Sequence, residues 1–508
     1  MKRSTLGLVF VALLACTPPA VWASAAQEQA ASQMEDVEIT VMLPQGSNIE
    51  FHPEAASYQA ITEATGVIVN LQPIPSSDYG AKLNTLIATN DVPDVARVGY
   101  NSYYDFAASG VFLAIDDLVA EHAPNFAAVR AVNPWIDRLR IEGTLYGFPW
   151  VSRDDVTKSP LPFIRMDLLE AQGLAEPSTF AELRDTLAAL KGAYPDTVGY
   201  ITRGPNALRN ILMYAMGSGW SLYFDPDVDG GRYVYGPATE AYRRNLEYMA
   251  GLYRDGLLDP DYAVTNSQGW QEKGGSGKGL FAHDNPIFMD RMNRALQSTM
   301  PDARFGFISV PADDRGNRRY VLYDVHPKQI WVIGANNPHA VRTVQMFNWL
   351  YSDEGADTRS LGIEGEHWEV VDGEKRIKQS LIDEYRERGD PYSLIQSEVG
   401  IAFSNFVPYY DNMLLKMTQI PLLQEWWFER VATDPARDYP LIDPPLGADE
   451  RERIRELRGT LSTLEQESFD KFVTGAQPIS QFDDVAAQMR AAGYEELEQI
   501  YNRAHAAQ

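Results

Sequence analysis

Three stretches decide the fold: Val37-Glu-Ile-Thr-Val-Met-Leu43, Val67-Ile-Val-Asn-Leu71 and Pro93-Asp-Val-Ala-Arg-Val98. The first alternates apolar and polar residues, and each of the three predicts a strand. A helix is expected over residues 53–64, and a second where apolar residues recur at helical spacing, at Tyr79, Leu83, Leu86 and Ile87. This β-α-β-α-β order predicts a parallel sheet with helices on its faces.

Strand–helix alternation begins again at Leu161, which predicts a second α/β lobe. Residues 145–151 and 319–333 are expected to be extended crossings between the lobes. The apolar spacing of Ile454, Leu457, Leu461 and Leu464 predicts an amphipathic helix in the C-terminal part. Two lobes joined by crossings form a clamshell, and open α/β sheets bind ligands in the cleft at the carboxyl ends of their strands.

Local motifs refine the second lobe. Thr179 and Glu182 have the spacing of a capping box, and a helix is expected over residues 238–254. Asp225-x-Asp227-x-Asp229-Gly230 imitates a calcium loop but has Gly236 at the twelfth position, so a hairpin turn is favoured. The glycine-rich run 273–279 lacks the P-loop spacing and predicts a mobile loop.

Composition excludes several classes of protein. The chain has 508 residues, an apolar share of 45% and a net charge of −26. That length corresponds to two or three domains with a sizeable core. A strongly acidic chain does not suit nucleic acid or anionic membrane surfaces, which attract basic patches.

The N-terminus predicts export, with residues 1–25 as a signal peptide. Lys2 and Arg3 precede a short apolar run that ends at Ala15. Cleavage near Ala23 would release a soluble protein, which we favour. The alternative is a lipobox, Leu13-Leu-Ala-Cys16, in which Cys16 would be lipidated. Cys16 is the single cysteine of the chain, so the mature protein has no disulfide in either case.

Several short stretches, each weak alone, occur together in an order typical of one family. They are Thr85-Leu-Ile-Ala-Thr-Asn-Asp-Val-Pro-Asp-Val95, Ser109-Gly-Val-Phe-Leu-Ala-Ile-Asp-Asp-Leu118, Gly143-Thr-Leu-Tyr-Gly-Phe-Pro-Trp150, Leu252-Tyr-Arg-Asp-Gly-Leu-Leu-Asp-Pro260, Tyr351-Ser-Asp-Glu-Gly355, Leu361-Gly-Ile-Glu-Gly-Glu-His-Trp368 and the tail 469–484. Over most of its mature length the chain resembles the extracellular solute-binding proteins of carbohydrate ABC importers. It is most similar to their long branch, typified by lipoprotein LplA and the alginate-oligosaccharide binders.

The resemblance implies a type II periplasmic-binding-protein fold, an α/β clamshell with discontinuous lobes and a helical C-terminal extension. Residues 36–150 plus 327–390 would form lobe 1, and residues 151–326 plus 391–508 would form lobe 2. Family cleft residues come from the loops after the first and third strands, from the crossings and from aromatic positions. Here these positions are Gln45, Asn48, Tyr100, Asn101, Trp150, Trp220, Trp270, Trp368 and Trp427.

Each candidate has a plainer interpretation. Aromatic rings favour burial, so most tryptophans are expected in the core, and adjacent Trp426 and Trp427 on a helix cannot both face a ligand. Arginines near strand ends can hold a carboxylate with a bidentate fork, although solvation is their commoner role. If two or more line the cleft, the ligand is an acidic glycan; the candidates are Arg97, Arg153, Arg165 and Arg203.

The sequence departs from the family at its calcium loop. Relatives carry Asp-x-Asn-x-Asn-Gly there, whereas this chain has Lys191-Gly-Ala-Tyr-Pro-Asp-Thr-Val-Gly199 without the oxygen ligands. We find no catalytic or nucleotide-binding motif, and we expect no metal and no cofactor.

These observations predict a non-enzymatic, monomeric, extracytoplasmic protein that captures an oligosaccharide by hinge closure. It would deliver the sugar to the permease subunits of an ABC importer and would not bind nucleic acid. Two alternatives stay open. A secreted carbohydrate-active enzyme, a lyase or hydrolase, would need a carboxylate or Tyr/His pair facing a groove. A sugar-sensing subunit of a histidine kinase would have the same fold and another partner.

Overall fold

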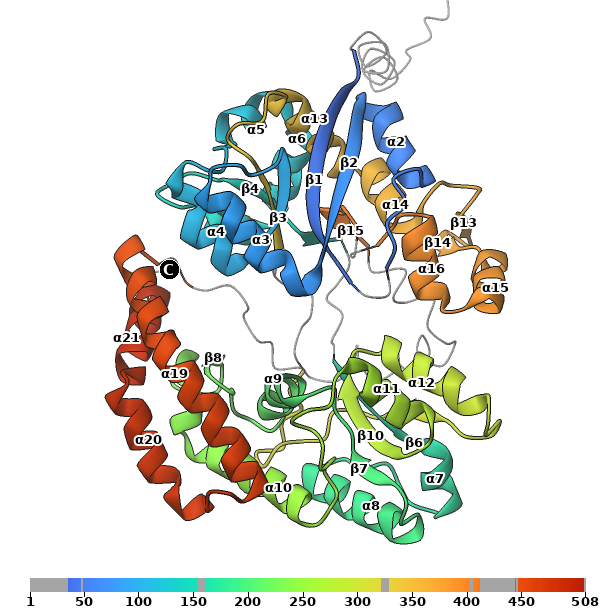
Figure 1. Cartoon of the computed structure of the whole chain (residues 1–508), viewed down its shortest axis with the longest axis vertical. Helices are drawn as coiled ribbons and strands as arrows, with labels where there is room; N and C mark the ends of the chain where they lie inside the picture. Colours follow the sequence, from blue (N-terminus) through green and yellow to red (C-terminus); the bar gives the residue numbers. More distant parts are fainter. Residues whose placement is uncertain are drawn as a thin grey trace, which may run out of the picture.

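The computed structural model describes residues 35–46, 49–153, 160–320, 329–402, 405–411, 444 and 446–506. They form two α/β lobes, as the two runs of strand–helix alternation predicted (Figure 1). The predictions for the signal peptide, Cys16, Asn48 and Trp426-Trp427 fall outside the described residues, as does the middle of the second crossing, 321–328.

A five-stranded sheet in the order β2-β1-β3-β12-β4 forms the centre of the first lobe. β1 (Val37–Gln45) pairs in parallel with β2 (Val67–Pro75) and with β3 (Val95–Gly99), as predicted. β12 (Gln329–Ile333) lies antiparallel between β3 and β4 (Gly147–Pro149). The first lobe is therefore built from segments that are far apart in the sequence.

Helices cover both faces of this sheet, which is why β1 is buried from Ile39 to Leu43 apart from Thr40. The first helix ends at Gly66, whose positive φ of 62° suits a residue without a side chain. The helices are α2 (Ala56–Thr65), α3 (Ser76–Ala88), α4 (Tyr100–Phe106), α5 (Asp116–His122), α6 (Pro124–Val132), α13 (Ala340–Leu350) and α14 (Asp353–Leu361).

A smaller cluster with its own apolar core extends the first lobe. It contains β13 (Trp368–Val371), β14 (Glu374–Ile377), α15 (Gln379–Arg388) and α16 (Pro391–Glu398). The hydroxyl of Ser57 in α2 donates to the carbonyls of Val399 (2.6 Å) and Gly400 (3.1 Å), so the segment after α16 is held by the first lobe.

The predicted passage to the second lobe at residue 390 is corrected by these contacts. Phe406 enters the core of the first lobe, and β15 (Tyr409–Tyr410) pairs in parallel with β5 (Val151–Ser152). Residues 391–402 and 405–411 therefore lie with the first lobe, because their apolar and hydrogen-bonding partners are there. The other predicted bounds of the two lobes stay predictions.

The second lobe contains a four-stranded sheet in the order β11-β6-β10-β7. Only β10 and β7 pair in parallel; β6 runs antiparallel to both of its neighbours. The strands are β6 (Leu161–Arg165), β7 (Val198–Tyr200), β10 (Gly279–Asp284) and β11 (Phe305–Phe307), and the helices are α7 (Met166–Ala171), α8 (Phe180–Ala193), α9 (Pro205–Ala215), α10 (Glu240–Arg254), α11 (Ser267–Gly275) and α12 (Ile287–Gln297).

The local motifs of this lobe are confirmed in part. β8 (Leu222–Asp225) and β9 (Arg232–Tyr235) form the expected hairpin. The Thr179 hydroxyl accepts the Glu182 N–H at 3.2 Å, but the Glu182 carboxylate accepts from the N–H and hydroxyl of Ser178, one residue earlier than a capping box requires.

The prediction of a mobile loop over residues 273–279 is wrong for residues 273–275, which belong to α11. Gly274 and Gly275 are the last residues of α11 and are buried. A Cβ at Gly274 would meet the Met292 side chain at 2.2 Å, and one at Gly275 would meet Ala295 at 2.7 Å. These glycines let α11 pack closely against α12, a helical use of glycine that the sequence pattern did not reveal.

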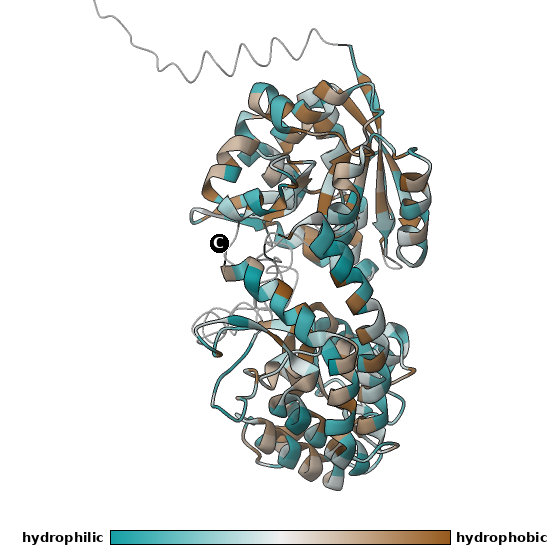
Figure 2. Cartoon of the chain, turned by 90° about the vertical axis from the view of Figure 1, so that its left-hand side faces the viewer, coloured by the Kyte–Doolittle hydropathy of each residue, from teal (hydrophilic) through white to brown (hydrophobic). Residues whose placement is uncertain are grey.

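Three C-terminal helices complete the second lobe: α19 (Ala448–Thr474), α20 (Phe482–Ala491) and α21 (Tyr494–Ala506). The predicted amphipathic helix is α19, whose Leu457, Leu461 and Phe469 enter the second-lobe core. Figure 2 views the molecule from the left-hand side of Figure 1. These three helices lie alongside both lobes there and carry many hydrophilic residues. In the described part of the chain, no helix is apolar over a length that could cross a bilayer.

Candidate functional site

In the described residues, side-chain contacts join the two lobes at two places. The helices that carry these contacts lie on opposite sides of the molecule (Figure 1). On one side, α12 of the second lobe contacts α15 and α16 of the first. On the other side, α19 contacts α4. The candidate site lies between these contacts, where the first-lobe strands β1 and β3 end and where the crossings leave the lobe.

The contact of α12 combines ionic and apolar groups, and we call it the clasp (Arg291, Arg294, Asp390 and Ser393). Arg291 Nη2 donates to Asp390 Oδ2 at 2.6 Å and to Ser393 Oγ at 2.9 Å, while Arg294 Nη2 donates to Asp390 Oδ1 at 2.8 Å. Ile287 packs into the apolar cluster of α15 and α16 beside it. Asp390 therefore joins the lobes through two guanidinium groups.

Next to the clasp is a cavity of about 620 Å³, the polar pocket. It lies against the ends of β1 and β2 and against α16, and it is lined by Gln45, Gly46, Ile49, Glu50, His52, Pro75, Ser393, Leu394, Ser397 and Glu398. The structure thus places the predicted Gln45 at this cavity, although its amide donates to the Ile49 carbonyl at 2.9 Å. Hydrogen bonds from Arg388 lower the pKa of Glu398, which keeps it ionised.

On the α19 side lies a cavity of about 240 Å³, the arginine pocket. Its described lining is Tyr100, Asn101, Tyr104, Asp105, Pro444, Leu446, Arg451, Ile454, Arg455, Arg458 and Tyr501. Tyr100 and Asn101, both predicted from the sequence, stand here at the start of α4, directly after β3. The arginines were not among the candidates, although their spacing of four and three residues on a predicted helix places them on one face.

The crossings form a short two-stranded ribbon, β5 with β15. Trp150 is half-buried just before β5, and its ring stacks on that of Tyr410 with centroids 4.8 Å apart. Tyr409 stacks instead on Tyr351 of the first-lobe core. The predicted position of Trp150 in a crossing is therefore observed, and its contact with a ligand stays a prediction.

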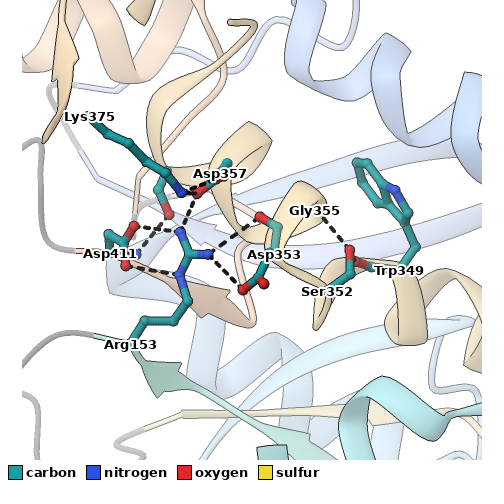
Figure 3. A network of polar contacts seen from close by, with 9 residues as sticks. Arg153, Trp349, Ser352, Asp353, Gly355, Asp357, Lys375 and Asp411 are labelled. Atoms are coloured by element: carbon teal, nitrogen blue, oxygen red, sulfur yellow. Dashed lines mark hydrogen bonds and ion pairs between the residues drawn. The ribbon is translucent and has the colours of Figure 1, made fainter. Parts of the chain in front are cut away.

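Arg153 follows β5 and is held by three aspartates (Figure 3). Its Nε donates to Asp411 at 2.9 Å, its Nη2 donates to Asp411 and Asp357, and its Nη1 lies 3.4 Å from Asp353. Lys375 also donates to Asp357, at 2.7 Å. Burial opposes the charge of Arg153, but the hydrogen bonds that it donates to Asp411 and Asp357 outweigh burial and raise its pKa.

The prediction of Arg153 as a ligand contact is corrected by this network, because its donors are taken by carboxylates of the protein. Asp353 and Asp357 belong to α14, which begins at the Ser352 cap, and Asp411 directly follows β15. Arg153 thus fastens both strands of the ribbon to a first-lobe helix at the point where they leave it.

Two predicted tryptophan contacts are wrong. Trp270 is fully buried, donates to the Ile201 carbonyl and packs edge-on against Phe288. Trp368 is also buried and donates to the Gly362 carbonyl at 3.0 Å. Neither ring has a free face for a sugar. Trp220 is half-buried with the Arg209 guanidinium 4.9 Å from its ring, and its role stays a prediction.

The remaining candidate arginines do not form an anion site in the cleft. Arg165 is buried and paired with Asp167 at 2.6 Å, and Arg203 pairs with Asp284 at 2.7 Å. Arg97 lies over the Trp331 ring, and burial lowers its pKa to about 10. No group of three or more His, Cys, Asp or Glu side chains suited to a metal ion occurs in the parts of the chain that the structure covers.

Comparison with known proteins agrees with this geometry. Residues 51–357 match the model of the bacterial extracellular solute-binding protein family. The polygalacturonan/rhamnogalacturonan-binding protein YtcQ of Bacillus subtilis (strain 168) is 22% identical over 480 residues, 89% of this chain and 88% of that protein.

Solved structures share the architecture. The alginate-binding protein AlgQ2, crystallised without calcium ion, superposes with a TM-score of 0.76 at 20% identity, over 92% of this chain and 98% of that one. The S. pneumoniae substrate-binding protein FusA, in complex with kestose, gives 0.71 at 18% identity over 92% and 98%. The predicted two-lobed type II periplasmic-binding-protein fold is thereby confirmed.

Proposed function

Because the chain belongs to the bacterial extracellular solute-binding protein family, we propose that it is the substrate-binding component of an ABC importer and captures an oligosaccharide by hinge closure. The observation that carries this proposal is the arginine pocket, whose described lining comes from α4 of the first lobe and α19 of the second, in a molecule whose described crossings form a narrow ribbon. Such a cleft can bury a ligand when the lobes rotate about the ribbon.

The chemistry of the cavities supports a sugar ligand. Amide, hydroxyl and carboxylate groups line the polar pocket, and tyrosine rings with an exposed Asn101 line the arginine pocket. Sugar hydroxyls need hydrogen-bonding partners, while the C–H faces of the rings pack on aromatic side chains. YtcQ, AlgQ2 and FusA are named or described with polysaccharide or oligosaccharide ligands, which supports the same class here.

A direct test is calorimetry of the purified mature protein with a panel of neutral and acidic oligosaccharides, each followed by chromatography of the recovered sugar. We expect one sugar to bind per chain, to raise the melting temperature and to be recovered intact. Cleaved or eliminated sugar would instead support a carbohydrate-active enzyme.

The importer role needs a second measurement. We expect the sugar-loaded protein to stimulate ATP hydrolysis by its permease and ATPase subunits reconstituted in vesicles, and the empty protein to do so weakly. Sugar-dependent stimulation of a histidine kinase, with no effect on a permease, would support the sensor alternative.

For localisation we propose an extracytoplasmic protein released by cleavage near Ala23. Labelling of growing cells with an alkyne fatty acid tests the lipidation alternative. We expect no label on the wild type; label that is lost in Cys16→Ser would show that the protein is anchored.

A further inference from the structure

The arginine pocket has one wall from each lobe. Tyr100 and Tyr104 of α4 pack against the first-lobe core, whereas Ile454 of α19 belongs to the second-lobe core. Across the pocket, Arg455 Nη2 lies 3.2 Å from Asp105 Oδ1, and the Arg451 guanidinium lies 5.1 Å from the Tyr104 ring centroid. A ligand held here would therefore touch both lobes at once.

The charge of the pocket is opposite to that of the whole chain. Arg451, Arg455 and Arg458 lie on one face of α19, at a spacing of four and three residues. In the described lining, these three guanidinium groups face a single carboxylate, Asp105. In a protein of net charge −26, such a local excess of cations attracts an anionic group.

Two of the arginines differ in how they are held. Arg458 donates to the hydroxyl of Tyr501 in α21 at 2.8 Å, and this hydrogen bond orients the Arg458 guanidinium. Arg451 makes only its ring contact with Tyr104 among the side chains that the structure describes, and no carboxylate there pairs with it. Arg453, on the neighbouring face, is by contrast paired with Glu456 and Glu496. The guanidinium of Arg451 is thus available to a bidentate anion.

The rest of the lining suits a sugar ring. The tyrosines of α4 are half-buried, and the Tyr100 hydroxyl donates to that of Tyr104 at 3.1 Å. Asn101 offers an exposed amide beside them. The volume of about 240 Å³ is below the roughly 300–1,000 Å³ of pockets that enclose a drug-sized ligand, so the pocket fits one sugar residue rather than a whole oligosaccharide.

We infer that the arginine pocket binds the carboxylate of a hexuronate residue of the captured oligosaccharide, with Arg451 and Arg455 as its cationic contacts. This inference rests on the proposed function and specifies the ligand class. It replaces the four arginines selected from the sequence, three of which are paired with aspartates, by a different set on α19.

A substitution at Asp105 distinguishes a ligand-binding role of Arg455 from a purely structural role. If Arg455 and Asp105 serve only to hold the lobes together, Arg455→Gln and Asp105→Asn break the same contact. The two substitutions then change the uronide affinity in the same direction. If the pocket binds a carboxylate, Asp105 competes with the ligand for Arg455. The two substitutions then have opposite effects on uronide affinity.

Calorimetry with the mature protein tests the inference. The probes are trisaccharides of galacturonate, mannuronate and glucuronate, each paired with its carboxyl-reduced neutral counterpart. We expect at least one uronide to bind about tenfold or more tightly than its counterpart, and Arg451→Gln to remove most of this preference. Arg455→Gln should reduce it and Asp105→Asn should increase it. Arg453→Gln, on the same helix but outside the pocket, should leave it unchanged.

The outcomes distinguish the inference from the proposed function. Neutral sugars that bind as tightly as the uronides, or a preference that survives in Arg451→Gln, would overturn the uronate site and leave oligosaccharide capture standing. Parallel effects of Arg455→Gln and Asp105→Asn would overturn it in favour of a lobe contact. If the folded protein bound no member of this panel or of the wider panel above, the proposed function would fail together with the inference.

Discussion

Arg153 shows how one residue can serve the hinge rather than the ligand. Its side chain is 12% exposed and neutralises Asp357 and Asp411, which are 16% and 12% exposed. Arg153→Gln would leave these carboxylates close together with only Lys375 to balance them. Loss of one partner from a largely buried ionic network is expected to lower the free energy of unfolding by about 3 kcal/mol.

Urea unfolding followed by tyrosine and tryptophan fluorescence measures this change. Arg184→Gln, which removes a solvent-exposed pair with Asp255, is the matched control and should have little effect. A variant of Arg153 with wild-type stability and abolished sugar binding would instead restore the original interpretation of this residue as a ligand contact.

The buried His283 makes the free energy of unfolding depend on pH. It lies in β10, and burial lowers its pKa from 6.5 to about 4. Between these two values the unfolded chain binds a proton at this site and the folded chain does not, so stability falls as the pH falls. The loss approaches about 3 kcal/mol at pH 4.

His283→Gln cannot titrate, so we expect its stability to decline less steeply than that of the wild type from pH 7 to pH 4.5. Chemical unfolding at several pH values compares the two slopes. Parallel curves would show that the imidazole is protonated equally in the folded and unfolded chains.

At the scale of elements, the loop from α8 to β7 is closed by an ammonium group. Lys191 Nζ donates to the Thr197 carbonyl at 3.0 Å, and the Thr197 hydroxyl donates back to the Tyr194 carbonyl. This is the loop in which the resemblance led us to look for calcium ligands. We expect Lys191→Met to lower the free energy of unfolding by about 1 kcal/mol through the lost hydrogen bond.

Calcium removal should have no effect on this loop. We expect the melting temperature of the wild type to be the same in excess calcium and in excess chelator, because an internal cation already satisfies the carbonyl. A melting temperature that rises with calcium concentration would reveal a metal site that this reasoning missed.

The elements also show what local sequence can predict. β1, β2, β3 and the helices between them follow apolar periodicity and a glycine stop, which are local signals. The same approach misjudged Gly274 and Gly275, since their role depends on Met292 and Ala295 of another helix. It also misjudged Trp270, because its burial depends on Ile201, directly after β7, and on Phe288 of α12.

At the scale of the whole molecule, the clasp sets the relation between the lobes. Burial alone would raise the pKa of Asp390, but the charge of Arg291 and the hydrogen bond from Ser393 outweigh it and lower the pKa below 3.8. The clasp is therefore fully charged above that value and is lost as the pH falls through the lowered pKa.

We expect Asp390→Asn to weaken the clasp and to shift the sugar-free protein toward a more open arrangement. Small-angle X-ray scattering would show this as a larger radius of gyration than that of the wild type at neutral pH. The control is Asp383→Asn in the preceding helix α15, since Asp383, among the described residues, accepts hydrogen bonds only within that helix, from Gln379 and Arg386. An unchanged radius in both variants would mean that the apolar contact of Ile287 alone holds this side.

The sequence by itself determined the two α/β lobes, the export signal as a prediction, and the place of Tyr100 and Asn101 directly after a strand. These properties depend on periodicity, capping and order along the chain, which are local. Only the tertiary structure decided that residues 391–402 and 405–411 lie with the first lobe, that Arg153 is occupied by aspartates, and that Arg451 and Arg455 face α4. Each of these depends on partners between about 50 and 350 positions away in the chain, and local sequence carries no information on which distant groups meet.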